Sequence, residues 1–360
     1  ATMNGYIKRV ALSAYRAQKR GGKGRSAMDV RDEDFATEIF ATNTHTPILF
    51  FSSKGKVYKL KTYKLPLGNP QARGRALVNL LPIEQDEKIS TILALPENEE
   101  SWKDLSIIFA TSSGDVRRNS MDQFTDIRSS GKIAMKLDGN ESLVGVNLCT
   151  ENNDIMLSTK NGKCIRFPVS KLRIFQSRNS TGVRGIKLDK GNEVIAMSVL
   201  KHSEADMLVK DQYLKIAVEK RIEMKEAIIF NQNLANNPSE DLLQQEPKPL
   251  PEIKSELAKD LVQNMAENED FILTITKNGY GKRSSAYEYR ITNRGGSGIT
   301  NIITSKRNGD VVASFPIDNS DQVMIITNKG TLIRSDISTV RITGRNTQGV
   351  TLIKAREGEN

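Results

Sequence analysis

Short runs of apolar residues recur in pairs along most of this chain, and each pair flanks a glycine. The run 48–51 (ILFF) precedes Gly55, and the run 57–60 (VYKL) follows it. Runs of this length that are bounded by turn residues are typical of β-strands, whereas a helix needs about ten or more residues. The pattern therefore predicts antiparallel hairpins with the glycine in the turn. Comparable runs precede later glycines at residues 107–109, 272–275 and 323–326.

A sixfold internal repeat underlies these hairpins. In each copy a Ser or Thr stands three residues before a glycine, and a cation stands four residues after it. A second glycine follows 17 to 20 residues after the first. We number the copies as repeats 1 to 6: Thr2-Gly5-Arg9, Ser52-Gly55-Lys59, Thr111-Gly114-Arg118, Thr159-Gly162-Arg166, Thr276-Gly279-Arg283 and Thr327-Gly330-Arg334. The second glycines are Gly24, Gly74, Gly131, Gly182, Gly298 and Gly349.

Each repeat predicts a four-stranded sheet. The pairs Asn4-Gly5, Asn161-Gly162 and Asn278-Gly279 predict two-residue type I′ turns, in which both central residues have positive φ. A third strand is expected after the second glycine, as in 76–80, and a fourth further on, as in 88–92. Six such units of about 50 residues favour an all-β fold of propeller-like blades, because ring closure leaves few open sheet edges.

One insertion interrupts the repeats. The first glycines of repeats 4 and 5 are 117 residues apart, and residues 201–269 account for the excess. We expect residues 1–360 to form one domain, with this partly helical insertion between blades 4 and 5. Helices are predicted over 208–230 and over 253–265, and the polar, proline-bearing stretch 236–251 is expected to be mobile. Whether the insertion docks a partner or is a lineage-specific addition stays open.

Charge separates the insertion from the repeats. The formal net charge is +10 and the pI is near 9.4. Residues 201–269 hold 9 Lys/Arg and 14 Asp/Glu, a net charge of −5, which leaves +15 on the rest of the chain. An excess of this size favours a polyanionic partner such as a nucleic acid.

Composition and spacing argue against several classes of protein. No stretch reaches the roughly 18 apolar residues that span a bilayer, and the first nine residues lack the apolar core of a secretion signal, so a cytoplasmic protein without a membrane partner is expected. Cys149 and Cys164 lack ligand spacing to each other and to the two histidines, so buried thiols are expected rather than a metal site. Phosphate-loop and catalytic-triad patterns fail as well, so we expect neither a catalytic residue nor a cofactor in this chain.

The strongest candidate for contact with a polyanion is the loop Gln18-Lys19-Arg20-Gly21-Gly22-Lys23-Gly24, which ends at the second glycine of repeat 1. Its glycines let backbone amides approach a phosphate, and its three cations supply charge, with Arg20 able to contact a phosphate through two donors. Nothing in the loop would recognise a base. We therefore expect duplex DNA to be recognised by shape and charge.

Cations at equivalent repeat positions form the second candidate set. Equivalent positions in a radial fold lie on a circle, so a recurring cation predicts a basic track around the rim, along which a duplex must bend. The predicted rim residues are Arg9, Arg25, Lys59, Arg73, Arg75, Arg118, Lys132, Arg166, Arg178, Arg184, Arg283, Arg294, Arg334 and Arg345.

The heptad 18–24 matches the gyrase box. Together with the flanking segments 5–9 (GYIKR) and 14–17 (AYRA) and the six repeats, it makes the chain resemble the C-terminal DNA-wrapping domain family of the bacterial DNA gyrase A subunit. The resemblance covers everything except 201–269. It implies a six-bladed β-pinwheel whose blades exchange strands and whose rim wraps DNA with positive handedness. It also implies that the box is needed for wrapping, with degenerate copies at 294–298 and 345–349.

The same resemblance implies partners and a catalytic context. It places the chain in a type II topoisomerase that introduces negative supercoils. The partners would be the N-terminal part of gyrase A and the gyrase B subunit in an A2B2 holoenzyme. That holoenzyme uses ATP and Mg bound elsewhere, and its cleavage tyrosine lies in the N-terminal part of gyrase A. We expect the isolated chain to be monomeric.

Two alternatives stay open. One is a topoisomerase IV-type domain that bends DNA without strong wrapping, and the intact heptad argues against it. The other is a propeller that serves as a scaffold for protein interactions. That alternative predicts apolar or aromatic patches on a face of the disc, whereas aromatic residues are only 6% of this chain and its cations align.

Overall fold

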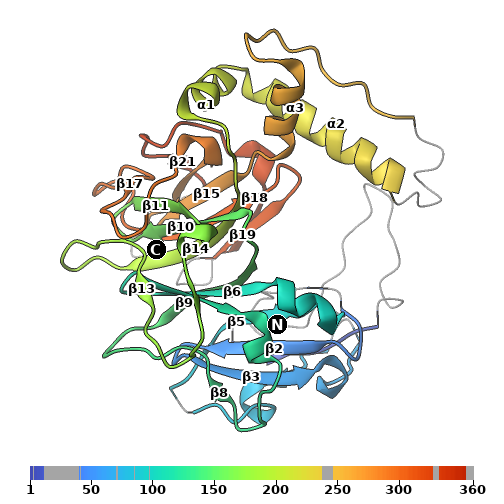
Figure 1. Cartoon of the computed structure of the whole chain (residues 1–360), viewed down its shortest axis with the longest axis vertical. Helices are drawn as coiled ribbons and strands as arrows, with labels where there is room; N and C mark the ends of the chain where they lie inside the picture. The colour runs from blue at the N-terminus through green and yellow to red at the C-terminus, as the bar shows by residue number, and fades with distance from the viewer. Residues whose placement is uncertain are drawn as a thin grey trace. The chain divides into compact units, whose positions relative to one another are not determined.

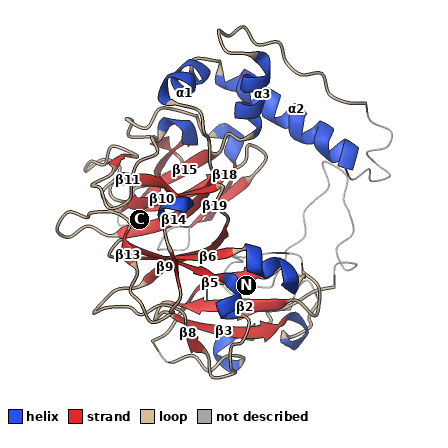
Figure 2. Cartoon of the chain, in the orientation of Figure 1, coloured by secondary structure: helices blue, strands red, loops and turns tan. Residues whose placement is uncertain are grey.

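Antiparallel sheets make up most of the structure, and the α-helices of the described residues all lie between β14 (Val194–Lys201) and β15 (Phe271–Thr276) (Figure 1 and Figure 2). The chain divides into two bodies, each with its own internal packing: Ala1–Thr150 with Leu172–Gly185, and Glu151–Lys171 with Ile186–Asn360. This computed structural model describes residues 1–353 apart from 3, 12–39, 41, 70–71, 85, 97, 237–245 and 327–331.

The strands of the described residues are short, and the longest of them has eight residues. Those of the first body are β1 (Tyr6–Ile7), β2 (Pro47–Ser52), β3 (Lys56–Lys61), β4 (Arg75–Ala76), β5 (Ile89–Ala94), β6 (Ser106–Thr111), β7 (Asp115–Ser120), β8 (Lys132–Ile133), β9 (Leu143–Cys149), β12 (Ile174–Phe175) and β13 (Val183–Arg184). Those of the second body, besides β14 and β15, are β10 (Asn153–Thr159), β11 (Lys163–Pro168), β16 (Tyr280–Ser285), β17 (Ile299–Thr300), β18 (Val311–Ile317), β19 (Gln322–Ile326), β20 (Leu332–Asp336) and β21 (Val350–Thr351).

One strand arrangement recurs from sheet to sheet. The central strands β2, β6, β10 and β15 precede a first glycine, and each pairs with its hairpin partner on one side and with the last strand of its repeat on the other. The outer edge of the sheet is completed by a two-residue strand of the next repeat, which is β8, β13, β17 or β21. In repeat 1, β4 completes β1 in the same way. The predicted all-β fold of blades that exchange strands is confirmed.

The central strands are apolar runs because both of their faces are covered. Every residue of β2, β6 and β15 is buried. In the first body the sheets of repeats 2 and 3 pack through Leu49, Phe51, Phe109 and Phe124, and the rings of Phe51 and Phe109 meet edge to face at 5.7 Å. Burial of one such side chain contributes about 1.5–3 kcal/mol. These layers between successive sheets are the main apolar core of each body.

The hairpin turns differ from the predicted type. The loops have three residues rather than two, as in residues 53–55, because Phe51 pairs with Val57 and the Gly55 amide donates to the Ser52 carbonyl at 3.0 Å. Gly55 has φ of +73°, which matches a type I turn followed by a glycine bulge. The Ser52 hydroxyl accepts a bond from the Lys56 amide at 3.2 Å. This bond explains why a Ser or Thr recurs three residues before the glycine.

The second glycines lie where a strand of one repeat reaches the sheet of the repeat before it. Gly298 has φ of +74°, and a Cβ there would lie 2.5 Å from the Cys164 carbonyl oxygen. Gly74, Gly182 and Gly349 are similarly close to backbone atoms of the preceding repeat. Strand exchange therefore requires glycine at this position, both for its backbone angles and for its lack of a side chain.

We expect Gly298→Ala to destabilise the second body more than Gly191→Ala does. Gly191 has φ of +78° but open space around it, so alanine there costs only the left-handed backbone, about 1–2 kcal/mol. Alanine at 298 adds the clash with Cys164 and should cost roughly 1–3 kcal/mol more. Thermal unfolding of the two variants measures the difference. Equal losses would show that the exchanged strand moves away at no cost.

Three helices form most of the insertion: α1 (Met207–Leu214), α2 (Val218–Asn236) and α3 (Lys259–Glu267). Figure 1 shows them together at one end of the second body. The predicted helix over 253–265 begins only at Lys259, because Ile253 and Leu257 reach the same apolar cluster from the chain before it.

The insertion contains a buried polar cluster and packs against repeat 5 through Tyr287, whose hydroxyl donates to the Met265 carbonyl at 2.9 Å. Arg221 forms an ion pair with Glu269, whose other carboxylate oxygen accepts a bond from the Tyr213 hydroxyl at 2.9 Å. The rings of Tyr213 and Tyr287 meet edge to face at 5.6 Å, and Tyr287 belongs to the 3₁₀ turn that follows β16. The helices therefore pack as part of the second body. Residues 237–245 of the stretch expected to be mobile lie outside the described residues.

Candidate nucleic-acid interface

The six aligned cations do not form one exposed set. Arg118, Arg166 and Arg283 are 2–4% exposed, and protein acceptors occupy their guanidinium groups. The prediction that these three arginines belong to the basic rim is therefore wrong. The hairpin strand that carries each of them lies next to the exchanged strand, so its side chain points into the joint between two successive repeats. A sequence repeat shows that positions are equivalent, but it does not show which way they face.

Arg166 shows, within the second body, how such a side chain connects two successive repeats. Its Nε donates to Asp154 Oδ2 at 2.8 Å, Nη1 donates to the Ala286 carbonyl at 2.6 Å, and Nη2 donates to the Lys201 carbonyl at 2.9 Å. Asp154 is fully buried, and its Oδ1 lies 2.7 Å from His202 Nδ1. Arg166 therefore compensates a buried carboxylate and links β11 to the next repeat.

Arg283 and Arg118 make equivalent joints through carbonyl and hydroxyl acceptors. Arg283 donates to the carbonyls of Val340 and Ser338 at 2.6 and 3.3 Å, and burial lowers the pKa of its guanidinium. Arg118 donates to Ser106 Oγ at 2.9 Å and to the Leu172 carbonyl at 3.4 Å. Both side chains therefore hold a segment of the following repeat by its backbone.

The other aligned cations are less enclosed. Arg9 is half-buried and donates from Nε to the Leu65 carbonyl at 2.9 Å, while Lys59 is half-buried and donates to the Thr125 carbonyl. Arg334 is exposed and donates to Gln322 Oε1 within its own hairpin. The aligned position therefore joins successive repeats in five of its six occurrences.

The remaining predicted rim cations gather around the second glycines. Arg75, Arg184 and Arg294 are exposed. The half-buried members have protein contacts that fix their position: Arg73 stacks on the Tyr6 ring at 3.9 Å, Lys132 donates to the Asp126 carbonyl at 2.9 Å, Arg178 donates to the Gln123 carbonyl at 3.4 Å, and Arg345 donates to the Thr300 carbonyl at 3.2 Å. The predicted box, Gln18 to Gly24, and Arg25 lie outside the described residues.

Lysines beside the hairpin turns are balanced by carboxylates. Glu84 binds Lys54 at 3.0 Å and Lys56 at 2.5 Å, and these bonds lower the pKa of Glu84 to about 2. In repeat 4, Asp189 and Glu193 bind Lys163 and Lys160 at 2.8 and 3.1 Å. The turns of repeats 2 and 4 therefore contribute little net positive charge.

Two further cations are buried, which the sequence pattern did not predict. Arg117 is fully buried and Lys282 is 1% exposed, and each directly precedes an aligned arginine. A signal for them was present, because repeats 1, 3 and 5 carry two successive cations: Lys8-Arg9, Arg117-Arg118 and Lys282-Arg283. Burial of both cysteines, by contrast, was predicted and is confirmed.

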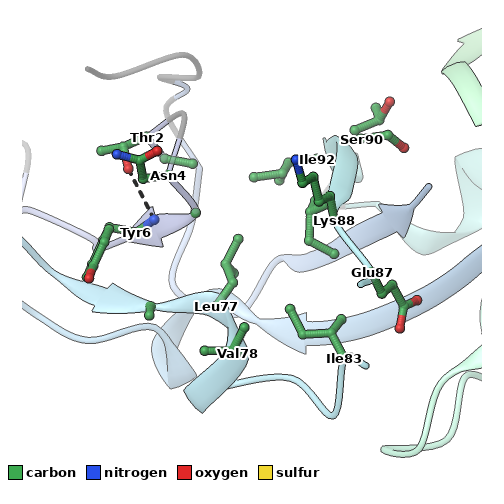
Figure 3. A pocket seen from close by; sticks show the side chains of 15 residues that line it. Thr2, Asn4, Tyr6, Leu77, Val78, Ile83, Glu87, Lys88, Ser90 and Ile92 are labelled. Atoms are coloured by element: carbon green, nitrogen blue, oxygen red, sulfur yellow. Dashed lines mark hydrogen bonds between the residues drawn. The ribbon is translucent and has the colours of Figure 1, made fainter. Parts of the chain in front are cut away.

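One large hollow, of about 740 Å³, lies between the first hairpin turn and the strand β5 of repeat 2. Figure 3 shows Thr2, Asn4 and Tyr6 on one side of it, Lys88 and Ile92 on the other, and Leu77, Val78 and Ile83 between them. Its carboxylate, Glu87, accepts bonds from the Tyr58 hydroxyl at 3.0 and 3.1 Å. This lining shows no catalytic grouping.

The described ranges hold no candidate for two other kinds of site. No three His, Cys, Asp or Glu residues there are grouped so that they could hold a metal ion. No helix there combines the length and apolarity that a membrane span requires.

Sheets that each borrow a short strand from the next repeat define a strand-exchanging, propeller-type domain, and here its arginines gather beside the exchanged strands. A family model described as the DNA gyrase C-terminal domain, beta-propeller, matches residues 1–43, 46–96, 106–150, 153–201, 270–318 and 321–360. The six matched segments correspond to the six repeats and leave out most of the insertion. The chain therefore belongs to the C-terminal domain family of the DNA gyrase A subunit, and the resemblance seen in the sequence is confirmed.

Curated relatives agree with this assignment. The chain is 50% identical over 358 residues to the DNA gyrase A subunit of Rickettsia bellii and 37% identical over 356 residues to that of Escherichia coli K12. Each alignment covers 99% of this chain but only 38% and 33% of the relative, so the chain spans roughly a third of their length.

Solved structures agree on the fold. The C-terminal domain of a DNA topoisomerase IV matches with a TM-score of 0.69, covering 98% of this chain and 87% of that one. A DNA gyrase A C-terminal domain matches with a TM-score of 0.62, covering 99% and 94%. Both are 19% identical to this chain, so they inform its fold and not its activity.

Proposed function

We propose that this chain binds double-stranded DNA by its phosphate backbone, without sequence preference, and wraps it. The observation that carries the proposal is that exposed arginines recur beside the second glycines, at Arg75, Arg184 and Arg294, in a chain of net charge +10. Arginine contacts phosphate through two parallel donors, and such contacts need no base. Arg118, Arg166 and Arg283, which are buried between successive repeats, take no part in this contact.

Wrapping rather than simple binding follows from the repeats. We infer that residues 1–360 form a single six-bladed domain, so that loops at equivalent positions lie along a curved path. A duplex that follows this path is bent, and neutralisation of its phosphates offsets part of the elastic cost. The box, Gln18 to Gly24, lies at the equivalent loop of repeat 1 and adds three cations to the path.

The proposal extends to the complete enzyme. The chain gives DNA gyrase, a type II topoisomerase, the positive wrap that precedes ATP-dependent negative supercoiling in the cytoplasm. Its partners are the N-terminal part of gyrase A and the gyrase B subunit in an A2B2 assembly. ATP and Mg bind elsewhere in that assembly, and this chain, monomeric when isolated, carries no catalytic residue of its own.

A linking-number assay tests the proposal. Nicked circular DNA is sealed by ligase in the presence of the 360-residue chain, stripped of protein and resolved on a topoisomer gel. We expect a positive shift in linking number that grows with protein concentration. Binding without a shift would favour a topoisomerase IV-type domain that only bends DNA. No binding at low salt would refute DNA recognition and favour an interaction scaffold.

A further inference from the structure

The residue that precedes each aligned cation alternates in chemistry along the chain. It is a cation in repeats 1, 3 and 5 and an uncharged residue in repeats 2, 4 and 6. The six residues are Lys8, Tyr58, Arg117, Ile165, Lys282 and Ile333, in chain order. We use the term exchange loop for the seven residues that end at a second glycine, which are 68–74, 125–131, 176–182, 292–298 and 343–349 in repeats 2 to 6.

The cations of the odd-numbered repeats hold the exchange loops of the even-numbered repeats through backbone carbonyls. Lys8 Nζ donates to the carbonyls of Asn69 and Ala72 at 3.1 and 2.7 Å. Arg117 Nη1 donates to the carbonyls of Arg178 and Ser180 at 2.5 and 2.7 Å. Lys282 Nζ donates to the Gly344 carbonyl at 3.2 Å. Each of these bonds lies within one body.

Apolar side chains take the equivalent place under the other loops. A Cβ on Gly131 would lie 2.5 Å from the Tyr58 ring, so that ring packs directly against the exchange loop of repeat 3. Under the loop of repeat 5, Ile165 Cδ1 lies 3.8 Å from the Cβ position of Gly296. The described exchange loops are therefore of two kinds: those of repeats 2, 4 and 6 rest on a cation, and those of repeats 3 and 5 rest on an apolar group.

Arg117 and Lys282 place buried positive charge directly against the exchange loops that they hold. No carboxylate of the described residues forms an ion pair with Arg117 or Lys282. Burial, followed by the nearby charge of Arg178, lowers the pKa of Arg117 to about 10. Burial lowers the pKa of Lys282 to about 7, while Glu288 and Cys164 raise it and Arg345 lowers it further. Arg178 and Arg345 belong to the exchange loops that Arg117 and Lys282 hold. Like charges therefore lie close together at each of these two loops.

We propose that Lys8, Arg117 and Lys282 are positioning residues for DNA: they fix the exchange loops of repeats 2, 4 and 6 so that the arginines of those loops bind phosphates of the duplex. This inference rests on the proposed function. A phosphate at the loop supplies negative charge beside the like charges of the loop and its buried cation. The positioning cations act at every second repeat, whereas Arg294, in the exchange loop of repeat 5, would contact phosphate without one.

Lys282→Met in the 360-residue chain tests the inference. Binding of a fluorescent duplex is followed by anisotropy over a range of salt concentrations. We expect binding about three- to tenfold weaker and a salt slope, the change in log K per log salt, smaller by about 0.9 for each phosphate that is no longer neutralised. Lys282→Arg should restore both values. Ile165→Met, which places the same side chain at the equivalent position of repeat 4, should leave both unchanged.

Proton uptake provides a readout that a purely structural role would not affect. A bound phosphate favours the charged form of Lys282, so DNA binding should raise its pKa from about 7 and take up protons. Affinity should therefore fall as pH rises from about 7 to 8.5, and this component should be absent in Lys282→Met. Calorimetry in two buffers of different ionisation enthalpy measures the uptake.

The outcomes separate this inference from the function on which it rests. A folded Lys282→Met that keeps the salt slope and the proton uptake of the original chain would overturn the inference and leave DNA binding intact. Failure of the original chain to bind DNA would overturn the proposed function instead. If Lys282→Met does not fold, Lys282→Gln keeps a donor for the Gly344 carbonyl without the charge. The salt slope and the proton uptake of that variant then test the inference.

Discussion

Replacement of Arg166 by methionine should destabilise the second body by about 3–5 kcal/mol, because it leaves the fully buried Asp154 carboxylate without its cation. The carbonyls of Ala286 and Lys201 would also lose their donors. The same change at the exposed Arg294 should alter the free energy of unfolding by no more than about 0.5 kcal/mol. The order should be reversed for DNA affinity, which Arg294→Met should reduce more than Arg166→Met does.

Hydrogen exchange of peptides from β10 and β11 measures this stability directly. Tryptophan fluorescence is less suitable, because the only tryptophan, Trp102, lies in the first body. A loss below about 1 kcal/mol in Arg166→Met would show that Asp154 is satisfied by its other partner, His202, and that the connection between repeats 4 and 5 does not depend on the arginine.

Neutralisation of the box should abolish wrapping while leaving most of the binding. The change is Lys19→Gln with Arg20→Gln and Lys23→Gln. The exposed arginines beside the other second glycines remain, so the duplex is still bound, but the path loses three charges at one loop. We expect the positive linking-number shift to disappear and the affinity to fall by a smaller factor, together with a smaller salt slope.

A control with the same change in charge is available in the hairpin turns. Lys54→Gln, Lys56→Gln and Lys163→Gln together also remove three positive charges, but these lysines are bound to Glu84 and Asp189. This triple variant should keep the linking-number shift. Loss of the shift in both variants would mean that net charge alone, rather than the box, controls wrapping. Complete loss of binding in the box variant would refute a path shared among the repeats.

The sequence predicted local structure correctly wherever a pattern of residue types fits only one structural element. Alternation of apolar runs and glycines predicted the hairpins, and the sixfold pattern predicted one sheet for each repeat. The expected third strand over 76–80 is instead β4 followed by a 3₁₀ turn, Leu77–Asn79, because only two residues reach the neighbouring sheet. The turn type was also wrong, since Asn-Gly pairs suit both two- and three-residue loops.

The repeat, the strand positions, the glycines and an excess of positive charge at equivalent sites all follow from the amino-acid order alone. Which of those charges face solvent is settled only when the chain is folded. Arg166 and Arg334 occupy the same place in the pattern, yet Arg166 is buried in a joint between repeats and Arg334 is exposed. The physical reason is that exposure depends on which neighbouring chain segment covers a strand. Exchanged strands come from the next repeat, so no local pattern records what lies above a given side chain.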